Sequence, residues 1–133
     1  MKRDMDLVRR ILFEIEKLPP FTCDIISIDG YDMQEIAYHC KMLYEEGFID
    51  EYTESTVDNF SGVVRFTVKD LTWKGQDLVE TIRQETVWNK TKTTIKEKGL
   101  SMVTDTIKTV ASAFITAAAE GVANSIIKSG GQV

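Results

Sequence analysis

The hydrophobic positions between Met33 and Tyr44 recur every three or four residues, which places them on one face of an amphipathic helix. Most charged residues of this segment fall on the opposite face. Gly47 follows the last periodic position, where a residue in the left-handed conformation would end the helix. The apolar face includes Cys40, which we expect in the core. The neighbouring His39 is expected near the helix surface.

The pattern then changes to alternation over residues 48–55, a run rich in strand-forming residues, and again over 63–69, where Val64, Phe66 and Val68 fall on one side. The polar segment between the two runs contains an Asp-Asn and a Ser-Gly dipeptide, both typical of turns. Two alternating runs joined by a short polar loop predict a β-hairpin. A helix that ends at a glycine and continues directly into a hairpin is the arrangement of the recognition helix and wing of a winged-helix domain.

The remaining segments are predicted to be helical, apart from one short apolar run, Ile25–Ile28, that predicts a strand. Pro19-Pro20 ends the first helix because proline disfavours helical geometry in the preceding residue. Thr72 can cap a later helix, since its hydroxyl can accept a hydrogen bond from a backbone N–H of the first turn. The predicted helices are Asp4–Lys17, Thr72 to about Trp88, Asn89–Lys98 ending at Gly99, and the alanine-rich Ser101–Lys128.

In this order the elements predict an α+β fold, a winged-helix domain over residues 1–88 made of helix, short strand, helix, β-hairpin wing and helix. A helical C-terminal extension follows over 89–128, and a disordered tail over 129–133. The pattern departs from a full helix-turn-helix in one respect. Such a motif needs two helices between the first strand and the wing, and residues 30–46 leave room for one. This shortage argues against the usual major-groove docking.

Composition fits a soluble protein with a single core, with 133 residues, 43% hydrophobic and 28% charged. Cys23 and Cys40 are too few for a disulfide framework, and the charged opening of the chain is unlike a secretory signal. We therefore expect a reduced, cytoplasmic protein.

Charge bears directly on DNA binding, the commonest role of winged helices. Residues 31–62 contain eight acidic residues and one basic residue, Lys41, a net charge of −7. Contacts to phosphate come largely from Lys and Arg, so this face is poorly suited to nucleic acid. If nucleic acid binds, better candidates lie elsewhere: Arg9, Arg10, Lys90, Lys92, Lys96 and Lys98. Solvated helix faces are the favoured explanation of these charges, since runs of charge alone are a weak signal.

No pattern of residues calls for a catalytic centre, a metal or a cofactor. His39 is the only histidine, and it neighbours Cys40 in the predicted helix. Adjacent helical residues point about 100° apart, so these two side chains are poorly placed to share an ion or a proton. Cys23 adds no ligand pair at the short spacing of zinc sites. We expect a protein that is not an enzyme.

The last helix carries two apolar strips, which predict a homo-oligomer rather than a membrane span, because Glu120 and Asn124 interrupt its apolar length. One strip runs from Val103 to Ile126, and the other is a row of small residues that lets helix backbones approach closely. The candidate residues for self-association are Val110, Ala113, Phe114, Ala117, Gly121 and Ser125. Phe60, a large apolar residue in the polar wing-tip loop, is a candidate contact for another protein.

Two segments, KMLYEEGFIDEY and LTWKGQDLVETI, resemble winged-helix regulators. Together with the opening MKRDMDLVRRIL and the later VWNKTK, they also resemble a family of uncharacterised proteins from phages and prophages. The resemblance implies a setting but no activity. We therefore expect a non-enzymatic interaction module with an unidentified protein partner, and the alternative is a DNA-binding transcriptional regulator.

Overall fold

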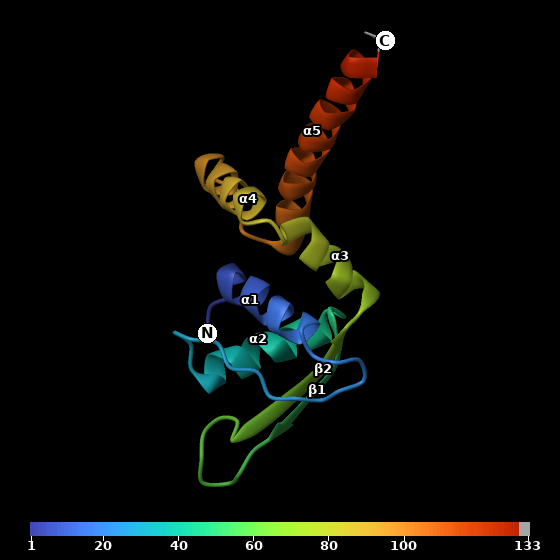
Figure 1. The fold of residues 1–133 in the computed structure, drawn as a ribbon. Coiled ribbons are helices and arrows are strands. Elements are labelled where there is room, and N and C mark those ends of the chain that lie inside the picture. Colours follow the sequence, from blue (N-terminus) through green and yellow to red (C-terminus); the bar gives the residue numbers. More distant parts are fainter. Residues whose placement is uncertain (131–133) are drawn as a thin grey trace. The chain divides into compact units, whose positions relative to one another are not determined.

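The structure, a computed structural model, describes the backbone of residues 1–130 and the side chains of residues 1–127 (Figure 1). The described chain has an α+β fold with five helices and one two-stranded antiparallel hairpin. It divides into two compact units, one formed by Met1–Val79 and the other by the chain from Glu80 onwards. Each unit is described by itself.

Two helices of the first unit begin at an aspartate. In α1 (Met5–Glu16), the carboxylate of Asp4 accepts a hydrogen bond from the backbone N–H of Leu7 at 3.1 Å. In α2 (Met33–Glu45), Asp32 accepts one from Glu35 at 2.9 Å. Each bond satisfies an N–H that has no partner inside its helix. Both helices were predicted from the sequence, and both predictions are confirmed.

The predicted hairpin is also confirmed, as β1 (Ile49–Ser55) and β2 (Arg65–Leu71). The pairing runs from Ile49 opposite Leu71 to Ser55 opposite Arg65. α1 packs on β2, α2 packs on β1, and the two helices pack on each other, so they cover one face of the hairpin (Figure 1). The core of this unit lies between the helices and that face.

The strand predicted over Ile25–Ile28 is wrong. The chain pairs with β2 at the residue before this segment, where the backbone groups of Asp24 and Val68 exchange hydrogen bonds of 3.0 and 2.9 Å. The chain then leaves the edge of the sheet. Ile26 and Ile28 lie in an irregular loop, and their side chains are buried. A short apolar run predicts burial but does not distinguish a strand from a buried loop.

Two hydrogen bonds from Thr72 join the segment after α2 to the start of α3 (Trp73–Ile82), and we call this contact the base of the hairpin. The backbone N–H of Thr72 donates to the carbonyl of Phe48 at 3.1 Å, and its hydroxyl donates to the carbonyl of Gly47. The same hydroxyl accepts from the N–H of Gly75 at 3.1 Å, which confirms Thr72 as an N-cap. A Cβ at Gly75 would lie 2.1 Å from the Phe48 oxygen, so a glycine is required there.

The single helix predicted from Thr72 to about Trp88 is wrong, because α3 ends at Ile82 and α4 (Glu85–Glu97) begins after a two-residue break. Ile82 and Trp88 are both buried. In one continuous helix these residues, six positions apart, would point about 120° away from each other. The break reorients the chain so that both side chains can be buried. α4 ends before Gly99, as predicted.

α5 (Thr104–Gly130) packs on α4 through its first half. The buried residues of these two helices are Trp88, Thr91, Ile95, Ile107 and Ala111. α5 starts at Thr104 rather than at the predicted Ser101. Of the expected tail, Ser129 and Gly130 are the last two positions of α5, and residues 131–133 lie outside the described residues.

Candidate functional site

His39 is 1% exposed, so the expectation that it lies near the helix surface is wrong. One ring nitrogen, Nδ1, lies 2.7 Å from the carbonyl of Glu35, and the other, Nε2, accepts a hydrogen bond of 2.9 Å from the backbone N–H of Asp4. These partners assign a neutral ring with its proton on Nδ1, because a carbonyl can only accept and an N–H can only donate. The imidazole therefore joins α2 to the start of α1, and both its nitrogens are occupied.

The same network continues through the carboxylate of Asp4, which also accepts a hydrogen bond of 3.1 Å from the hydroxyl of Tyr31. Burial, together with this bond and the negative charge of Asp4, raises the pKa of Tyr31. The carboxylate of Asp4 thus caps α1 and binds the hydroxyl of Tyr31, and the backbone N–H of Asp4 donates to His39. The network supports the packing of α1 on α2.

The two cysteines are in different surroundings. Cys40 is fully buried, as predicted, and burial raises the pKa of its thiol to about 12. A neutral, buried thiol is a poor nucleophile and a poor metal ligand. Cys23 is exposed, with its Sγ 4.0 Å from a carboxylate oxygen of Glu51. Within residues 1–130, no group of three or more His, Cys, Asp and Glu side chains is arranged to hold a metal ion.

The candidate basic residues are distributed over both units, and several contact aromatic rings of their own unit. The guanidinium of Arg9 lies 4.6 Å from the ring centre of Phe13. Arg10 lies 5.9 Å from the ring centre of Tyr31 and donates to the carbonyl of Asp29 at 3.2 Å. Lys92 lies 5.6 Å from the ring centre of Trp88. Lys90, Lys96 and Lys98 are exposed on α4 and at its C-terminal end.

The self-association candidates all lie on α5. Val110 and Phe114 are half-buried, and the four small residues of the row, Ala113, Ala117, Gly121 and Ser125, are exposed. A Cβ added at Gly121 would meet no atom within 4 Å. Every residue from 115 to 127 is exposed, including Ile115, Val122, Ile126 and Ile127.

By length and composition, Thr104–Ile127 is also long and apolar enough to cross a membrane, a property that core helices of soluble proteins share.

Phe60 is 50% exposed at the tip of the hairpin. The loop around it is fixed by a residue that the sequence did not single out, Gln34 of α2. The Gln34 side-chain amide donates to the carbonyl of Val63 at 2.7 Å and accepts from its N–H at 2.8 Å. A Cβ at Gly62 would lie 2.5 Å from the Gln34 amide oxygen. The loop and α2 are therefore in close contact.

Two other aromatic side chains are more exposed than Phe60. Phe21 is 87% exposed and Trp73 is 83% exposed. Phe21 has a left-handed backbone with φ of 62°, and its N–H donates to both carboxylate oxygens of Asp70 at 3.2 Å. Asp70 is itself left-handed, with φ of 46°. Such conformations are costly for residues other than glycine.

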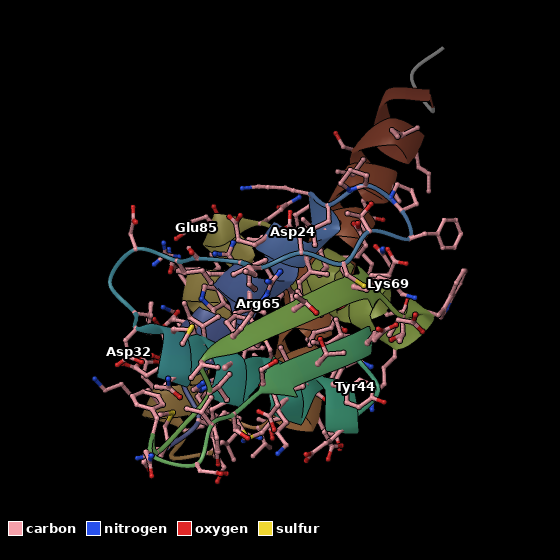
Figure 2. The ribbon with its side chains drawn as sticks, turned by 90° about the horizontal axis from the view of Figure 1, so that it is seen from below. Asp24, Asp32, Tyr44, Arg65, Lys69 and Glu85 are labelled. Atoms are coloured by element: carbon pink, nitrogen blue, oxygen red, sulfur yellow. The ribbon has the colours of Figure 1, made fainter. Side chains whose placement is uncertain are left out.

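The solvent-facing side of the hairpin carries an ion-paired cluster. Figure 2 shows Arg65 and Lys69 towards opposite ends of β2, with Asp24 on the segment beside it. The ammonium of Lys69 lies 3.1 Å from Glu51 and 3.5 Å from Asp50. The hydrogen bond to Glu51 and its negative charge raise the pKa of Lys69.

Comparison with known proteins assigns the chain to a family. Residues 2–101 match the family described as hypothetical protein DUF2513. The chain belongs to this family. An uncharacterized protein of Haemophilus influenzae (strain ATCC 51907 / DSM 11121 / KW20 / Rd) is 37% identical over 118 residues, which cover 87% of this chain and 97% of the relative. No solved structure matches the chain. The DUF2513 match includes α1 to α4 and both strands, and it stops before α5 begins.

Proposed function

We propose that this member of the DUF2513 family is a cytoplasmic, non-enzymatic interaction module that self-associates through α5. The single observation that carries the proposal is the exposure of α5 from residue 115 to residue 127, where the helix is rich in apolar side chains. Contiguous exposed apolar surface of this kind usually marks an interface. A symmetric homodimer is the commonest closed arrangement.

The energetics are consistent with association. Full burial of an Ile or Val side chain contributes about 1.5–3 kcal/mol. Each copy exposes four such side chains between residues 115 and 127 of α5: Ile115, Val122, Ile126 and Ile127. Because these side chains are only 40–71% exposed in one copy, burying eight of them in a dimer would contribute on the order of 10 kcal/mol, which is comparable with the roughly 4–15 kcal/mol that association costs. The small row would let the two helix axes approach closely.

We propose further that the first unit is a variant of the winged-helix fold, with β1 and β2 as its wing. The order of α1, α2, the hairpin and α3 supports this, as does the direct passage from α2 through Gly47 into β1. The phage or prophage setting is part of the proposal and rests on the sequence resemblance alone.

A DNA-binding regulator is the second candidate, favoured by the same order of elements. The charge of residues 31–62 disfavours it, since eight acidic residues would face the phosphates. Arg9 and Arg10 contribute little to it, because each lies against a ring of its own unit.

Light scattering coupled to size-exclusion chromatography tests self-association. We expect a dimer or larger oligomer at tens of micromolar, and a monomer for a chain ending after Phe114, which keeps the part of α5 that covers α4, with circular dichroism to check that this shorter chain folds. Ala117→Leu or Gly121→Leu should weaken association by about 1–3 kcal/mol through overpacking. Lys108→Ala is the matched control on the same helix and should leave association unchanged.

The design separates a disrupted interface from a disrupted fold, because the space around a Cβ at Gly121 is empty within one copy. Gly121→Leu should therefore retain its helical circular dichroism. A full-length chain that is monomeric at these concentrations refutes self-association. A full-length chain that requires detergent to remain in solution indicates that α5 enters a membrane instead.

A further inference from the structure

The hairpin tip carries apolar side chains that its own unit leaves uncovered. Phe60, Val57 and Val64 are all exposed. Val64 lies in the bend directly before β2, two positions from the buried Phe66, so it adds exposed apolar surface at the loop end of the strand. The surface formed by these three residues is called the tip surface below.

The tip surface is held in one conformation. The Gln34 amide binds both backbone groups of Val63, and Gly62, with φ of 117°, lies against the same amide. The N–H of Val64 donates to the carbonyl of Ser55 at 2.9 Å and closes the loop. A surface that is ordered before binding loses little conformational entropy when a partner docks.

The charges around the tip surface select the partner. Asp32 and Asp58 are exposed at the start of α2 and within the loop. Residues 31–65 contain eight acidic residues and two basic ones: Lys41, which lies 3.4 Å from Glu54, and Arg65, which is exposed directly after Val64. Such a surface repels nucleic acid and anionic lipid, and it attracts Lys and Arg.

We infer that the tip surface is the docking site for a cationic segment of another protein, which carries at least one large apolar side chain to cover Phe60. The inference rests on the proposed role as an interaction module and names the chemistry of the second partner. The apolar contact provides the anchor, and the acidic rim provides orientation and a faster encounter.

Two synthetic peptides test the inference with the full-length protein. Both have twelve residues and six lysines; one has a central Leu-Trp-Leu, and the other has three serines in its place. Fluorescence anisotropy at about 150 mM salt should show the Leu-Trp-Leu peptide binding at least roughly tenfold tighter. Amide shifts in the ¹⁵N spectrum should concentrate at residues 32–38 and 55–64. Equal affinity for the two peptides, or shifts spread over all acidic segments, overturns the inference.

Matched variants locate the site. Phe60→Ser should weaken binding of the Leu-Trp-Leu peptide about tenfold or more. Phe21→Ser removes an aromatic ring that is more exposed and lies elsewhere, so it should leave the affinity unchanged. Asp58→Lys should weaken both peptides. An equal effect of Phe60→Ser and Phe21→Ser shows that the peptide binds exposed rings in general and refutes the site.

Light scattering on the same samples keeps the two proposals apart. Phe60→Ser should retain the oligomeric state of the parent chain, and Gly121→Leu should retain peptide binding. If Phe60→Ser lowers the oligomeric state instead, the occupant of the tip surface is a second copy of this chain, and the inference is wrong.

Discussion

His39 replaces water at the beginning of a helix. The N–H of Asp4 would otherwise need a solvent acceptor, and the imidazole of a residue 35 positions away supplies one. The same ring is anchored by the carbonyl of Glu35, so its orientation is fixed from α2. His39 stabilises the packing of α1 on α2 because its ring bonds to both helices at fixed positions. A residue that replaces it must supply both a hydrogen-bond acceptor and a donor.

The two cysteines should differ in reactivity towards a thiol reagent such as Ellman's reagent at pH 8. Cys23 is exposed and should react in the native protein, whereas Cys40 is buried as a neutral thiol and should react only in denaturant. Cys23→Ser should therefore yield a native protein with no rapidly reacting thiol. Equal rates for both thiols in the native state would contradict this.

The pKa of Cys40 also has a consequence for stability. Because burial raises the pKa in the folded state to about 12, the unfolded chain loses this proton first as the pH rises. The contribution of the thiol to the free energy of unfolding is therefore complete below about pH 8.5 and decreases from there towards pH 12. Cys40→Ala should reduce that dependence in urea unfolding between pH 8 and pH 10.

Phe21 should be dispensable for stability. Phe21→Gly removes a left-handed strain of about 1–2 kcal/mol and introduces an entropic cost of about 0.5–1 kcal/mol, so the free energy of unfolding should stay level or rise slightly. Phe21→Ala, which keeps the strain, is the control and should be the less stable of the two in urea unfolding. If Phe21→Gly is clearly destabilised, the ring packs against something in the folded chain.

Local signals of this chain could be predicted from the sequence, and distant contacts could not. Thr72 accepts a hydrogen bond from the N–H three positions on, so its sequence position suffices to predict it as a cap; for the first helix the sequence offers both Asp4 and Asp6, and Asp4 is the cap. The bond between Phe21 and Asp70 joins residues 49 positions apart, and that between Gln34 and Val63 joins residues 29 apart. Hydrophobic periodicity contains no information on such pairs. The contact between Gln34 and the hairpin loop could therefore not be predicted from the sequence.

Among the elements, the base of the hairpin gives a physical reason for the sequence pattern Leu-Thr, two residues, Gly. Thr72 caps α3 and also bonds to Gly47 and Phe48, and Gly75 allows the backbones to meet. This sequence pattern therefore reflects a structural contact between the hairpin and α3, and it does not indicate a catalytic or binding site. By contrast, no proline or glycine marks the break between α3 and α4 in the sequence. The only indication is that Ile82 and Trp88, both buried, would face different directions in one continuous helix.

Gly75→Ala should destabilise the first unit by about 1–3 kcal/mol or more, because the new Cβ would overlap the Phe48 carbonyl and force the base apart. Gly121→Ala is the matched control in α5, where the Cβ meets nothing within 4 Å in the same copy, and should stabilise the helix of a single copy by about 0.5–1 kcal/mol. Thermal unfolding followed by circular dichroism compares them. Similar shifts for the two variants would contradict the contact at the base.

For the whole molecule, charge differs between the two units. Residues 1–79 carry nine basic and sixteen acidic residues, a net charge of −7, and residues 80–133 carry seven basic and five acidic residues, a net charge of +2. The net charge of −5 conceals this division. Anionic and cationic partners are therefore expected to prefer different units.

Any binding to duplex DNA should be weak, independent of sequence and sensitive to salt, because it would depend on phosphate contacts from the second unit. Replacing Lys90, Lys92 and Lys96 by Glu should abolish it in a fluorescence anisotropy titration at low salt. The control is Lys41→Ala, which should have no effect. Nanomolar, sequence-specific binding that is lost in Lys41→Ala would instead support the regulator.

The base of the hairpin holds the start of β1 and the end of β2 together. These contacts do not depend on an intact peptide chain at the tip of the hairpin. A single protease cut between Val57 and Phe60 would break one peptide bond and leave Gly47, Phe48, Thr72 and Gly75 in contact. We expect the two fragments to elute together from a sizing column and to separate only in denaturant. The tip is thus the position at which the first unit can be opened, extended by an inserted peptide, or rejoined in a different order.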